Sequence, residues 1–390
     1  MVIRWCLPLS LEPVGWIFRA VNEGVALTRP DERAELPQRR ARLVRRLERE
    51  GLDGMLVTSP ANVRYLSGFT GSNGWLLVGG DRTVLVTDPR YEIQAHTQVD
   101  CDVWVTRSKL VGTLAKLVRK WGWRRIGFET AHLRHEAYAG LSETAQSGVE
   151  WVPLKGWVER LRACKSQWEI ERVRQAAATA AQAFDAIVPL LKPGLTEKEV
   201  ATELDYRLRR LGADRAAFET IVATGPNSAL PHAQPTDRQL QAGEPVLLDF
   251  GAQRHCYASD MTRTVHLGAA PASFRRLYAA VLEAQQAALE AVRAGVTSAD
   301  VDEAARAVLS RHKLESLFVH ATGHGVGIEV HELPRLGKGE RARLREGMVV
   351  TIEPGIYVEG YCGIRIEDTV LVTQQGCEVL TQAPKNLLEL

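Results

Sequence analysis

Short apolar runs alternate with charged helical stretches between about Pro37 and Val152. The apolar runs cover residues 54–58, 75–78, 83–87, 103–106 and 125–128. Helical candidates cover residues 38–50, 61–66, 109–120 and 135–143. Short apolar runs bounded by turn residues are typical of buried strands, and strands that alternate with helices favour an α/β domain.

The pattern changes between residues 155 and 165, where a longer helical region begins. Ser166 and Glu169 have the spacing of a capping box and precede a long alanine-rich stretch. Thr196 and Glu199 repeat this signal ahead of a second helical stretch. A capping box marks the first turn of a helix, so two successive helices are expected to open a second domain. The chain therefore divides into a tail of uncertain status at 1–36, a domain at 37–155 and a domain at 156–390.

The helix pair occurs twice in the second domain. Gly194-Leu-Thr-Glu-Lys-Glu-Val200 is echoed by Gly295-Val-Thr-Ser-Ala-Asp-Val301, at a separation of 295 − 194 = 101 residues. This pattern predicts two related α/β halves with a ligand site in the cleft between them. The alternative is that Gly-aliphatic-Thr is merely a common way to enter a helix.

Composition narrows the class of protein. The chain has 390 residues, 45% of them hydrophobic and 25% charged, with a net charge of +2. These are ordinary globular values, and the near-neutral charge without a basic tract argues against a nucleic-acid partner. Six scattered cysteines without a C-x-x-C pair favour reduced thiols in a cytoplasmic protein.

No membrane segment is expected, because the chain has no apolar run long enough to span a bilayer. The stretch from Met1 to Ile17 begins with a basic residue and contains apolar ones, but Pro8, Glu12 and Pro13 interrupt it. We interpret it as an ordinary tail. A translation start assigned too far upstream is the rival hypothesis.

Two pairs of acidic residues lie at hairpin spacing in apolar surroundings. Asp249 lies in an apolar strand-like segment and Asp260 follows 11 residues later; Glu353 follows another apolar segment and Glu367 follows 14 residues later. Neighbouring carboxylates repel unless a shared proton or a cation neutralises them. His324 offers a nitrogen ligand between two glycines.

Each of these residues also has a purely structural interpretation. A strand aspartate can bond to backbone or pair with a basic residue, and Glu353-Pro354-Gly355 can be a plain turn. The set is harder to explain in this way, because four acidic side chains exceed what proton sharing relieves. The combination predicts two divalent cations held by Asp249, Asp260, His324, Glu353 and Glu367.

The same residues carry a family resemblance. Its motifs, in chain order, are Tyr257-Ala-Ser-Asp-Met-Thr-Arg263, His320-Ala-Thr-Gly-His-Gly-Val-Gly327, Glu353-Pro-Gly355 and Arg365-Ile-Glu-Asp368. They resemble the signature of the methionine aminopeptidase and creatinase superfamily, and the match extends from about residue 37. The segment from Ala61 to Thr70 resembles Xaa-Pro aminopeptidases and Xaa-Pro dipeptidases. The resemblance implies a creatinase-like N-terminal α/β domain at 37–155 and a pita-bread catalytic domain at 156–390.

The resemblance also implies a role for each ligand. Asp249 would bind one metal ion and His324 the other, Asp260 and Glu367 would bridge both, and Glu353 would bind the ion on the histidine side. Members of the family commonly use manganese or cobalt, which suits four carboxylates and one imidazole. Creatinases, which act without metal, have replaced these ligands, so that branch is disfavoured.

Further site residues follow from the same resemblance. Two cations can lower the pKa of a shared water and supply a bridging hydroxide as nucleophile, with Glu353 as the base. His232 and His331 match histidines that contact the substrate carbonyl and assist the leaving nitrogen. His320 and Arg365 match positions lining the site, although Arg365 could instead be a structural partner for a carboxylate. Three other histidines are expected outside the site, namely His255, His266 and His312.

The expected activity is release of the N-terminal residue from peptides with proline in second position. The first alternative is a dipeptidase that cleaves only Xaa-Pro, which would need a group that closes the site and binds the substrate carboxylate. The second is a catalytically silent peptide-binding module, against which the five retained ligands argue. A homodimer is expected from the resemblance alone.

Overall fold

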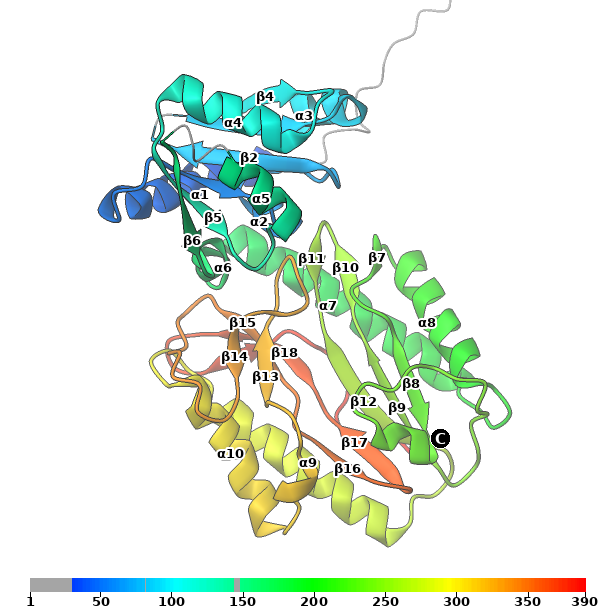
Figure 1. The fold of residues 1–390 in the computed structure, drawn as a ribbon. Coiled ribbons are helices and arrows are strands. Elements are labelled where there is room, and N and C mark those ends of the chain that lie inside the picture. Colours follow the sequence, from blue (N-terminus) through cyan, green and yellow to red (C-terminus); the bar gives the residue numbers. More distant parts are fainter. Residues whose placement is uncertain (1–29, 81, 144–147) are drawn as a thin grey trace, which may run out of the picture.

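A computed structural model describes residues 30–80, 82–143 and 148–390 (Figure 1). The segment from Met1 to Ile17 and Cys6, interpreted above from sequence, lie outside the described residues. The chain forms a smaller N-terminal unit and a larger second unit, and the helix α6 (Trp157–Arg162) leads from one to the other.

The N-terminal unit is built on a six-stranded mixed sheet with the order β4-β3-β2-β1-β5-β6. Its strands are β1 (Gly54–Val57), β2 (Gly74–Gly79), β3 (Arg82–Thr87), β4 (Asp102–Val105), β5 (Arg125–Glu129) and β6 (Glu150–Leu154). Its helices are α1 (Pro30–Arg49), α2 (Pro60–Ser67), α3 (Glu92–Gln98), α4 (Leu110–Trp121) and α5 (His135–Ser142). Alternate residues of β1 enter two separate apolar clusters, Met55 in one and Leu56 in the other, so both faces of the sheet are covered. The predicted alternation of strands and helices is confirmed, and α3 and β6 are additional elements.

Helix α1 begins at Pro30, ahead of the charged stretch that predicted it. Glu32 is buried in this first part and pairs with Arg64 of α2 at 2.6 Å. Leu36 is also buried. The residues from Glu32 onwards therefore pack onto the N-terminal unit.

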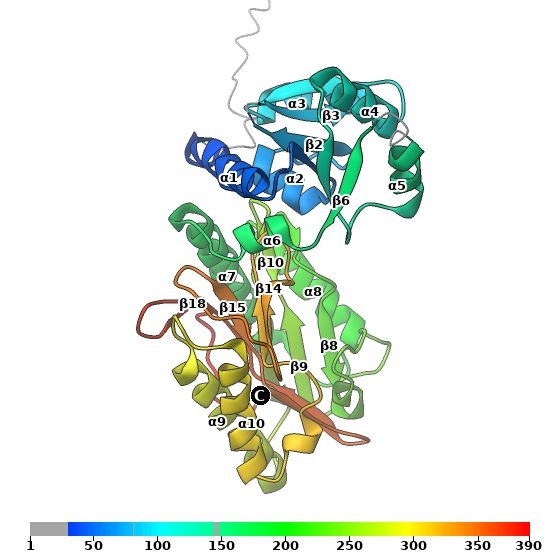
Figure 2. The same ribbon diagram turned by 60° about the vertical axis from the view of Figure 1, so that its left-hand side comes forward.

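The second unit carries two pairs of helices on the outside of its sheets (Figures 1 and 2). The pairs are α7 (Gln167–Ile187) with α8 (Glu197–Arg210), and α9 (Ala272–Ala291) with α10 (Ser298–Arg311). The capping boxes at Ser166 and Thr196 are both formed, and Thr297 forms a third at the start of α10. The predicted starts of α7 and α8 are confirmed.

The repeated heptapeptide adopts the same backbone conformation in both copies. Gly194 has φ 95° and Gly295 has φ 94°, a region that favours glycine. The N–H of Gly194 donates to the carbonyl of Leu240, and the N–H of Gly295 donates to that of Leu344, each at 2.9 Å. The second unit thus contains the internal repeat that the sequence predicted, with equivalent helix entries in its two halves.

Four groups of strands lie between the helix pairs. They are β7 (Arg215–Ala216), β10 (Ala252–Arg254) and β11 (Tyr257–Ala258); β8 (Ile221–Thr224), β9 (Pro245–Phe250) and β12 (Met261–His266); β13 (Gly323–Gly325), β14 (Glu332–Leu336), β15 (Val349–Ile352), β18 (Asp368–Val372) and β19 (Cys377–Val379); and β16 (Gly355–Val358) with β17 (Cys362–Arg365). The two halves join where the N–H of Glu367 donates to the carbonyl of Thr262 at 3.1 Å. Strands from both halves therefore approach one another at the centre of this unit (Figure 1).

Two sequence expectations about the chain as a whole can be compared with the described residues. Among these residues, no helix is long and apolar enough to cross a membrane. The five cysteines that fall within the described ranges all have free thiols.

Candidate metal centre

A cavity of about 710 Å³ opens where the two units meet, and all nine site residues predicted from sequence line it. These residues are His232, Asp249, Asp260, His320, His324, His331, Glu353, Arg365 and Glu367. The N-terminal unit adds the lining residues His132 and Lys155, and the linking helix α6 adds Glu159.

The first acidic pair comes from the hairpin of β9 and β12. Asp249 lies in β9 opposite Thr262 of β12, and Asp260 immediately precedes β12. Strand β9 is buried along its whole length, and Val246, Leu248 and Phe250 belong to one apolar cluster with residues of α7 and α8. The hairpin inferred from the 11-residue spacing is therefore present, and it brings both carboxylates into the cavity.

The second acidic pair comes from strands β15 and β18. Ile352, the last residue of β15, lies opposite Asp368, the first residue of β18. Glu353 directly follows β15 and Glu367 directly precedes β18. Because the two strands are antiparallel neighbours, the two glutamates lie at the same end of this strand pair.

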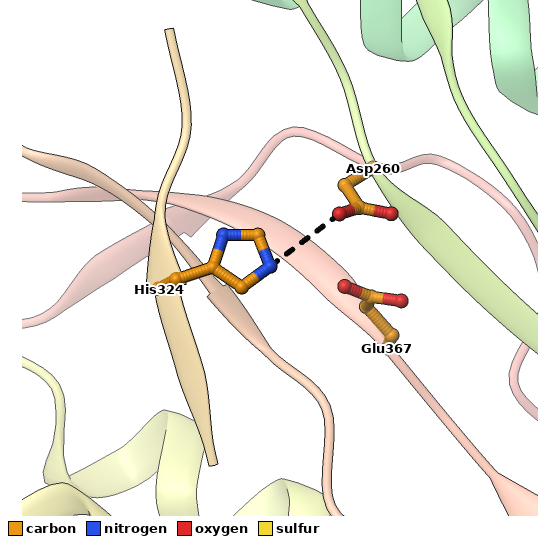
Figure 3. A group of neighbouring side chains, drawn as sticks. All are labelled: Asp260, His324 and Glu367. Atoms are coloured by element: carbon orange, nitrogen blue, oxygen red, sulfur yellow. Dashed lines mark ion pairs between the residues drawn. The ribbon is translucent and has the colours of Figure 1, made fainter. Parts of the chain in front are cut away.

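His324 joins the two acidic pairs. Its Nε2 lies 3.5 Å from Oδ2 of Asp260 and 3.4 Å from Oε1 of Glu353. Its Nδ1 lies 3.0 Å from the carbonyl oxygen of Gly325. A proton on Nδ1 satisfies that carbonyl and leaves the Nε2 lone pair directed at the carboxylates, as a metal-binding histidine requires. Figure 3 shows His324, Asp260 and Glu367 pointing toward one common point, with their donor atoms within 4.8 Å of one another.

The carboxylates of the site repel one another and leave oxygen atoms without partners, which a bound cation would satisfy. Oδ1 of Asp249 and Oδ1 of Asp260 are buried without a hydrogen-bond partner among the described residues. Burial and the neighbouring carboxylate of Glu367 raise the pKa of Asp260 well above its ordinary value, and burial and Glu353 do the same for Glu367. Buried polar atoms are normally satisfied. Four carboxylates and an imidazole therefore form a suitable donor set for divalent cations such as manganese.

Arg365 is a basic side chain bound to Asp249 of this acidic group. Its NH2 group donates to Oδ2 of Asp249 at 2.5 Å, and its Nε donates to Oγ1 of Thr262 at 3.0 Å. Its NH1 group donates to the hydroxyl of Tyr357 at 2.6 Å. In this structure Arg365 is thus a partner of a carboxylate, which is the structural alternative considered from sequence.

Three of the lining histidines are favoured in their neutral form. Burial lowers the pKa of His320, His324 and His331. The ring of His331 lies 4.3 Å from the ring of His324, centroid to centroid. Nε2 of His320 lies 2.8 Å from the hydroxyl of Tyr357. A neutral imidazole can accept a proton at its free ring nitrogen, and its N–H group can donate a hydrogen bond to a substrate.

The three histidines expected outside the site are not among the residues that line the cavity, namely His255, His266 and His312. His312 bonds to Glu283 on the outer helices at 2.7 Å, and Nδ1 of His266 lies 2.9 Å from the carbonyl of Gly268.

Several supporting residues had not been predicted. The hydroxyl of Thr262 donates to Glu367 at 2.6 Å, and that of Thr351 donates to Glu353 at 3.2 Å. Tyr357 links His320 to Arg365. The two threonines lie within or beside the acidic motifs, so their alternation with the acids along the strand could have indicated them. Nothing in the linear sequence indicates the N-terminal lining residues, because their place depends on how the two units pack.

The arrangement is suited to hydrolysis of an amide. Divalent cations, when bound, activate water and polarise a carbonyl in such a site. Burial raises the pKa of Glu353, whose Oε1 faces Nε2 of His324, so this carboxylate can accept and hold a proton. His331 and His320 also line the cavity, and the two ring nitrogens of His320 are bonded to the carbonyl of Ala321 and the hydroxyl of Tyr357, each at 2.8 Å.

Comparison with known proteins agrees with this chemistry. Residues 171–374 match the model of metallopeptidase family M24, and residues 39–164 match the creatinase/prolidase N-terminal domain. A relative named Xaa-Pro dipeptidase, from Pyrococcus furiosus, is 34% identical over 356 residues, which cover 90% of this chain and 100% of the relative.

Two solved structures share the fold over most of their length. The Xaa-Pro dipeptidase from Bacillus anthracis has a TM-score of 0.88 and 37% identity, covering 91% of this chain and 100% of its own. The X-Pro aminopeptidase from Thermotoga maritima has a TM-score of 0.82 and 36% identity, covering 88% of this chain and 100% of its own. The chain therefore belongs to metallopeptidase family M24, as a hydrolase with a creatinase-type N-terminal domain ahead of a pita-bread catalytic domain.

Proposed function

We propose that the protein is an Xaa-Pro dipeptidase that uses two divalent metal ions. The observation that carries this proposal is Arg335, a cavity-lining arginine beside the metal centre. A dipeptidase must bind the free carboxylate of the substrate proline, and an arginine at that place meets the requirement. Likeness to proteins named Xaa-Pro dipeptidase supports the same choice.

Arg335 lies on strand β14 directly opposite His324 of β13. Directly opposite residues of antiparallel strands project to the same face of the sheet, so Arg335 faces the cavity as His324 does. Within the described ranges, its guanidinium has no ion pair or hydrogen bond, and the residue is exposed. A free arginine offers paired N–H donors that match a carboxylate.

The metal centre proposed here has five ligands. Asp249 would hold one ion, His324 and Glu353 would hold the other, and Asp260 and Glu367 would be shared between them. Manganese is the first choice and cobalt the second, because oxygen-rich sets with one imidazole suit both. Glu353 also serves as the proton acceptor, while His232 and His331 contact the substrate and its leaving nitrogen.

An Xaa-Pro aminopeptidase is the second candidate, and the sequence motifs alone ranked it first. Likeness to the Thermotoga maritima enzyme favours it, as does the reach of the cavity to Lys155 and His132 of the N-terminal unit. That extension leaves room for residues beyond proline. Arg335 and the likeness to relatives named Xaa-Pro dipeptidase nevertheless favour the dipeptidase over the aminopeptidase.

One peptide series separates the two activities. We expect manganese-loaded protein to cleave Ala-Pro, and to leave Ala-Pro-Ala and Ala-Ala-Ala intact, with products measured by liquid chromatography and mass spectrometry. Cobalt and zinc are compared in parallel. Rapid release of alanine from Ala-Pro-Ala would establish the aminopeptidase instead, and cleavage of Ala-Ala-Ala would remove the proline requirement.

The remaining proposals concern the protein as a whole. We infer a domain boundary at 155/156, with the start of the N-terminal domain moved from the predicted residue 37 back to Glu32, whose side chain is buried against Arg64. We also infer a homodimer and a location in the cytoplasm, with neither nucleic acid nor membrane as partner. Light scattering during size-exclusion chromatography tests the dimer, since a monomer mass would contradict it.

A further inference from the structure

Arg162 stands at the junction of the two units, at the last position of α6. Its side chain is 2% exposed, although an arginine normally keeps its charge in water. Its NH1 group donates to Oδ1 of Asn62 at 2.7 Å, in the N-terminal unit. Its NH2 group donates to Glu332 at 2.5 Å and to Glu329 at 2.8 Å, in the second unit. One guanidinium therefore fastens the N-terminal unit to a single turn of the catalytic unit.

That turn carries His331. The carboxylate of Glu332 closes the turn, because its Oε1 accepts the N–H of Glu329 at 3.1 Å. The same carboxylate is 4% exposed, and Lys165 reaches its other oxygen at 3.2 Å. The ring of His331, between the two glutamates, lies against His324. A shift of Glu332 would thus move the His331 ring relative to the metal centre.

The N-terminal end of this connection is equally well held. Nδ2 of Asn62 donates to Glu129 at 2.6 Å, and Glu129 also accepts the backbone N–H groups of Thr58 and Ser59. All of these groups lie at the ends of strands in the six-stranded sheet or on α2. Arg162 is therefore tied to a rigid part of the N-terminal unit, not to a loose surface loop.

We infer that Arg162 is a positioning residue for the reaction: it holds the turn at Glu329 to Glu332 so that His331 keeps its place over the metal centre. The inference rests on the substrate contact proposed for His331. It also gives the N-terminal unit a part in catalysis, because the unit supplies the anchor for a side chain of the active site. Misplacing a reacting group by about 1 Å can reduce a rate by about 10²-fold, so a small loss of positioning is measurable.

The test is a double-mutant cycle between Arg162 and His331 in the full-length, manganese-loaded protein. Arg162→Lys keeps the positive charge but cannot donate to Asn62 and to the two glutamates at the same time. It should lower kcat by about tenfold to a hundredfold, with KM little changed. In the His331→Ala background the same substitution should alter kcat by no more than about twofold, since the residue through which it acts is gone. Wild-type turnover of Ala-Pro in the same assay reports separately on the proposed function.

Arg174→Lys is the matched control, because Arg174 also bridges two glutamates, Glu171 and Glu378, but at the exposed surface. It should leave kcat unchanged. Equal loss from Arg162→Lys in both backgrounds, an unchanged kcat, or loss of bound manganese would each overturn the inference. If Arg162→Lys does not fold, Glu332→Gln replaces it, and the same outcomes decide.

Discussion

At the scale of single residues, the metal centre brings together carboxylates whose negative charge is not fully balanced by basic side chains. Asp249 forms an ion pair with Arg365, whereas Asp260 and Glu367 are buried beside other carboxylates. The pKa of both is raised in the folded state. A raised carboxyl pKa means that the folded state binds the proton more tightly than the unfolded state, so metal-free protein loses stability as pH rises above the ordinary carboxyl range.

Asp260→Asn tests this conflict. The metal-free variant should be more stable than metal-free wild type at pH 7, because one of the mutually repelling charges is removed. Activity should fall about a thousandfold or more, since a bridging ligand is lost. Thermal unfolding with and without manganese, together with hydrolysis of Ala-Pro, measures both effects.

His255→Asn is its control, because asparagine tolerates the positive φ of 52° at that position and His255 lies outside the cavity lining. We expect near-normal activity from it. A metal-free Asp260→Asn protein that is less stable than wild type would contradict the account of charge crowding.

Arg335 supports a second prediction. Arg335→Met should raise KM for Ala-Pro by about tenfold to a hundredfold, because a hydrogen bond to a charged group contributes about 1.5–3 kcal/mol. Lys338→Met, an exposed cation in the same segment, should leave KM unchanged. Steady-state kinetics on the two variants decides: equal KM values for Arg335→Met and wild type would exclude Arg335 as the carboxylate anchor.

Sequence alone could name the residues of the centre but not its surroundings. Asp249 and Glu353 stand out because acids in apolar strands need a reason to be there. Arg335 and Arg162 do not stand out, since an arginine in a polar segment is ordinary until packing brings it to a cavity. Their roles depend on contacts between segments far apart in the chain.

At the scale of elements, the repeat could be recognised in the sequence because the start of a helix is marked by hydrogen bonds within its own first turn. Thr196 and Thr297 accept N–H groups within their own first turns, so the signal needs no tertiary contact. Two elements of the N-terminal unit lacked such signals. Helix α3 has seven residues and buries only Ala95 and Gln98, and edge strand β6 contains Pro153, which weakens a strand pattern.

The equivalence of the two halves yields a prediction about stability. Thr196→Ala and Thr297→Ala should each lower the free energy of unfolding by about 1 kcal/mol, through loss of the same cap. Thr202→Ala, in the exposed middle of α8, removes a hydroxyl that caps nothing and should change stability little. Urea unfolding followed by circular dichroism compares the three, and unequal losses at the two caps beyond experimental error would contradict the equivalence.

At the scale of the whole molecule, the catalytic cavity belongs to both units. His132, Lys155 and Glu159 form part of its wall, and Arg162 ties the wall to the turn of His331. This packing was beyond sequence reasoning, because a contact between Asn62 and Arg162 spans 100 residues. The two-unit chain is therefore the catalytic entity, and the second unit alone would lack one wall.

The ion pairs of Glu332 at the junction make the stability of the protein depend on pH. Burial opposes ionisation of Glu332, but Arg162 and Lys165 outweigh it and lower its pKa to about 2. A lowered carboxyl pKa contributes stability that is fully present above the unfolded value of about 4.5 and is lost as pH falls toward 2. Metal-free wild type should therefore exceed Glu332→Gln in unfolding free energy by about 3 kcal/mol at pH 7, with the difference shrinking below about pH 4.5. Urea titrations at pH 7, 5, 4 and 3 check this, and a constant difference would contradict it.

The central claim is that the five ligands form a two-metal centre for the hydrolysis of Xaa-Pro. The most direct test is a manganese titration of metal-free protein, with release of proline from Ala-Pro as the readout. We predict no turnover without metal and a rise that saturates at two equivalents of manganese per chain. Turnover by the metal-free protein, or no release of proline at any manganese concentration, would contradict the claim.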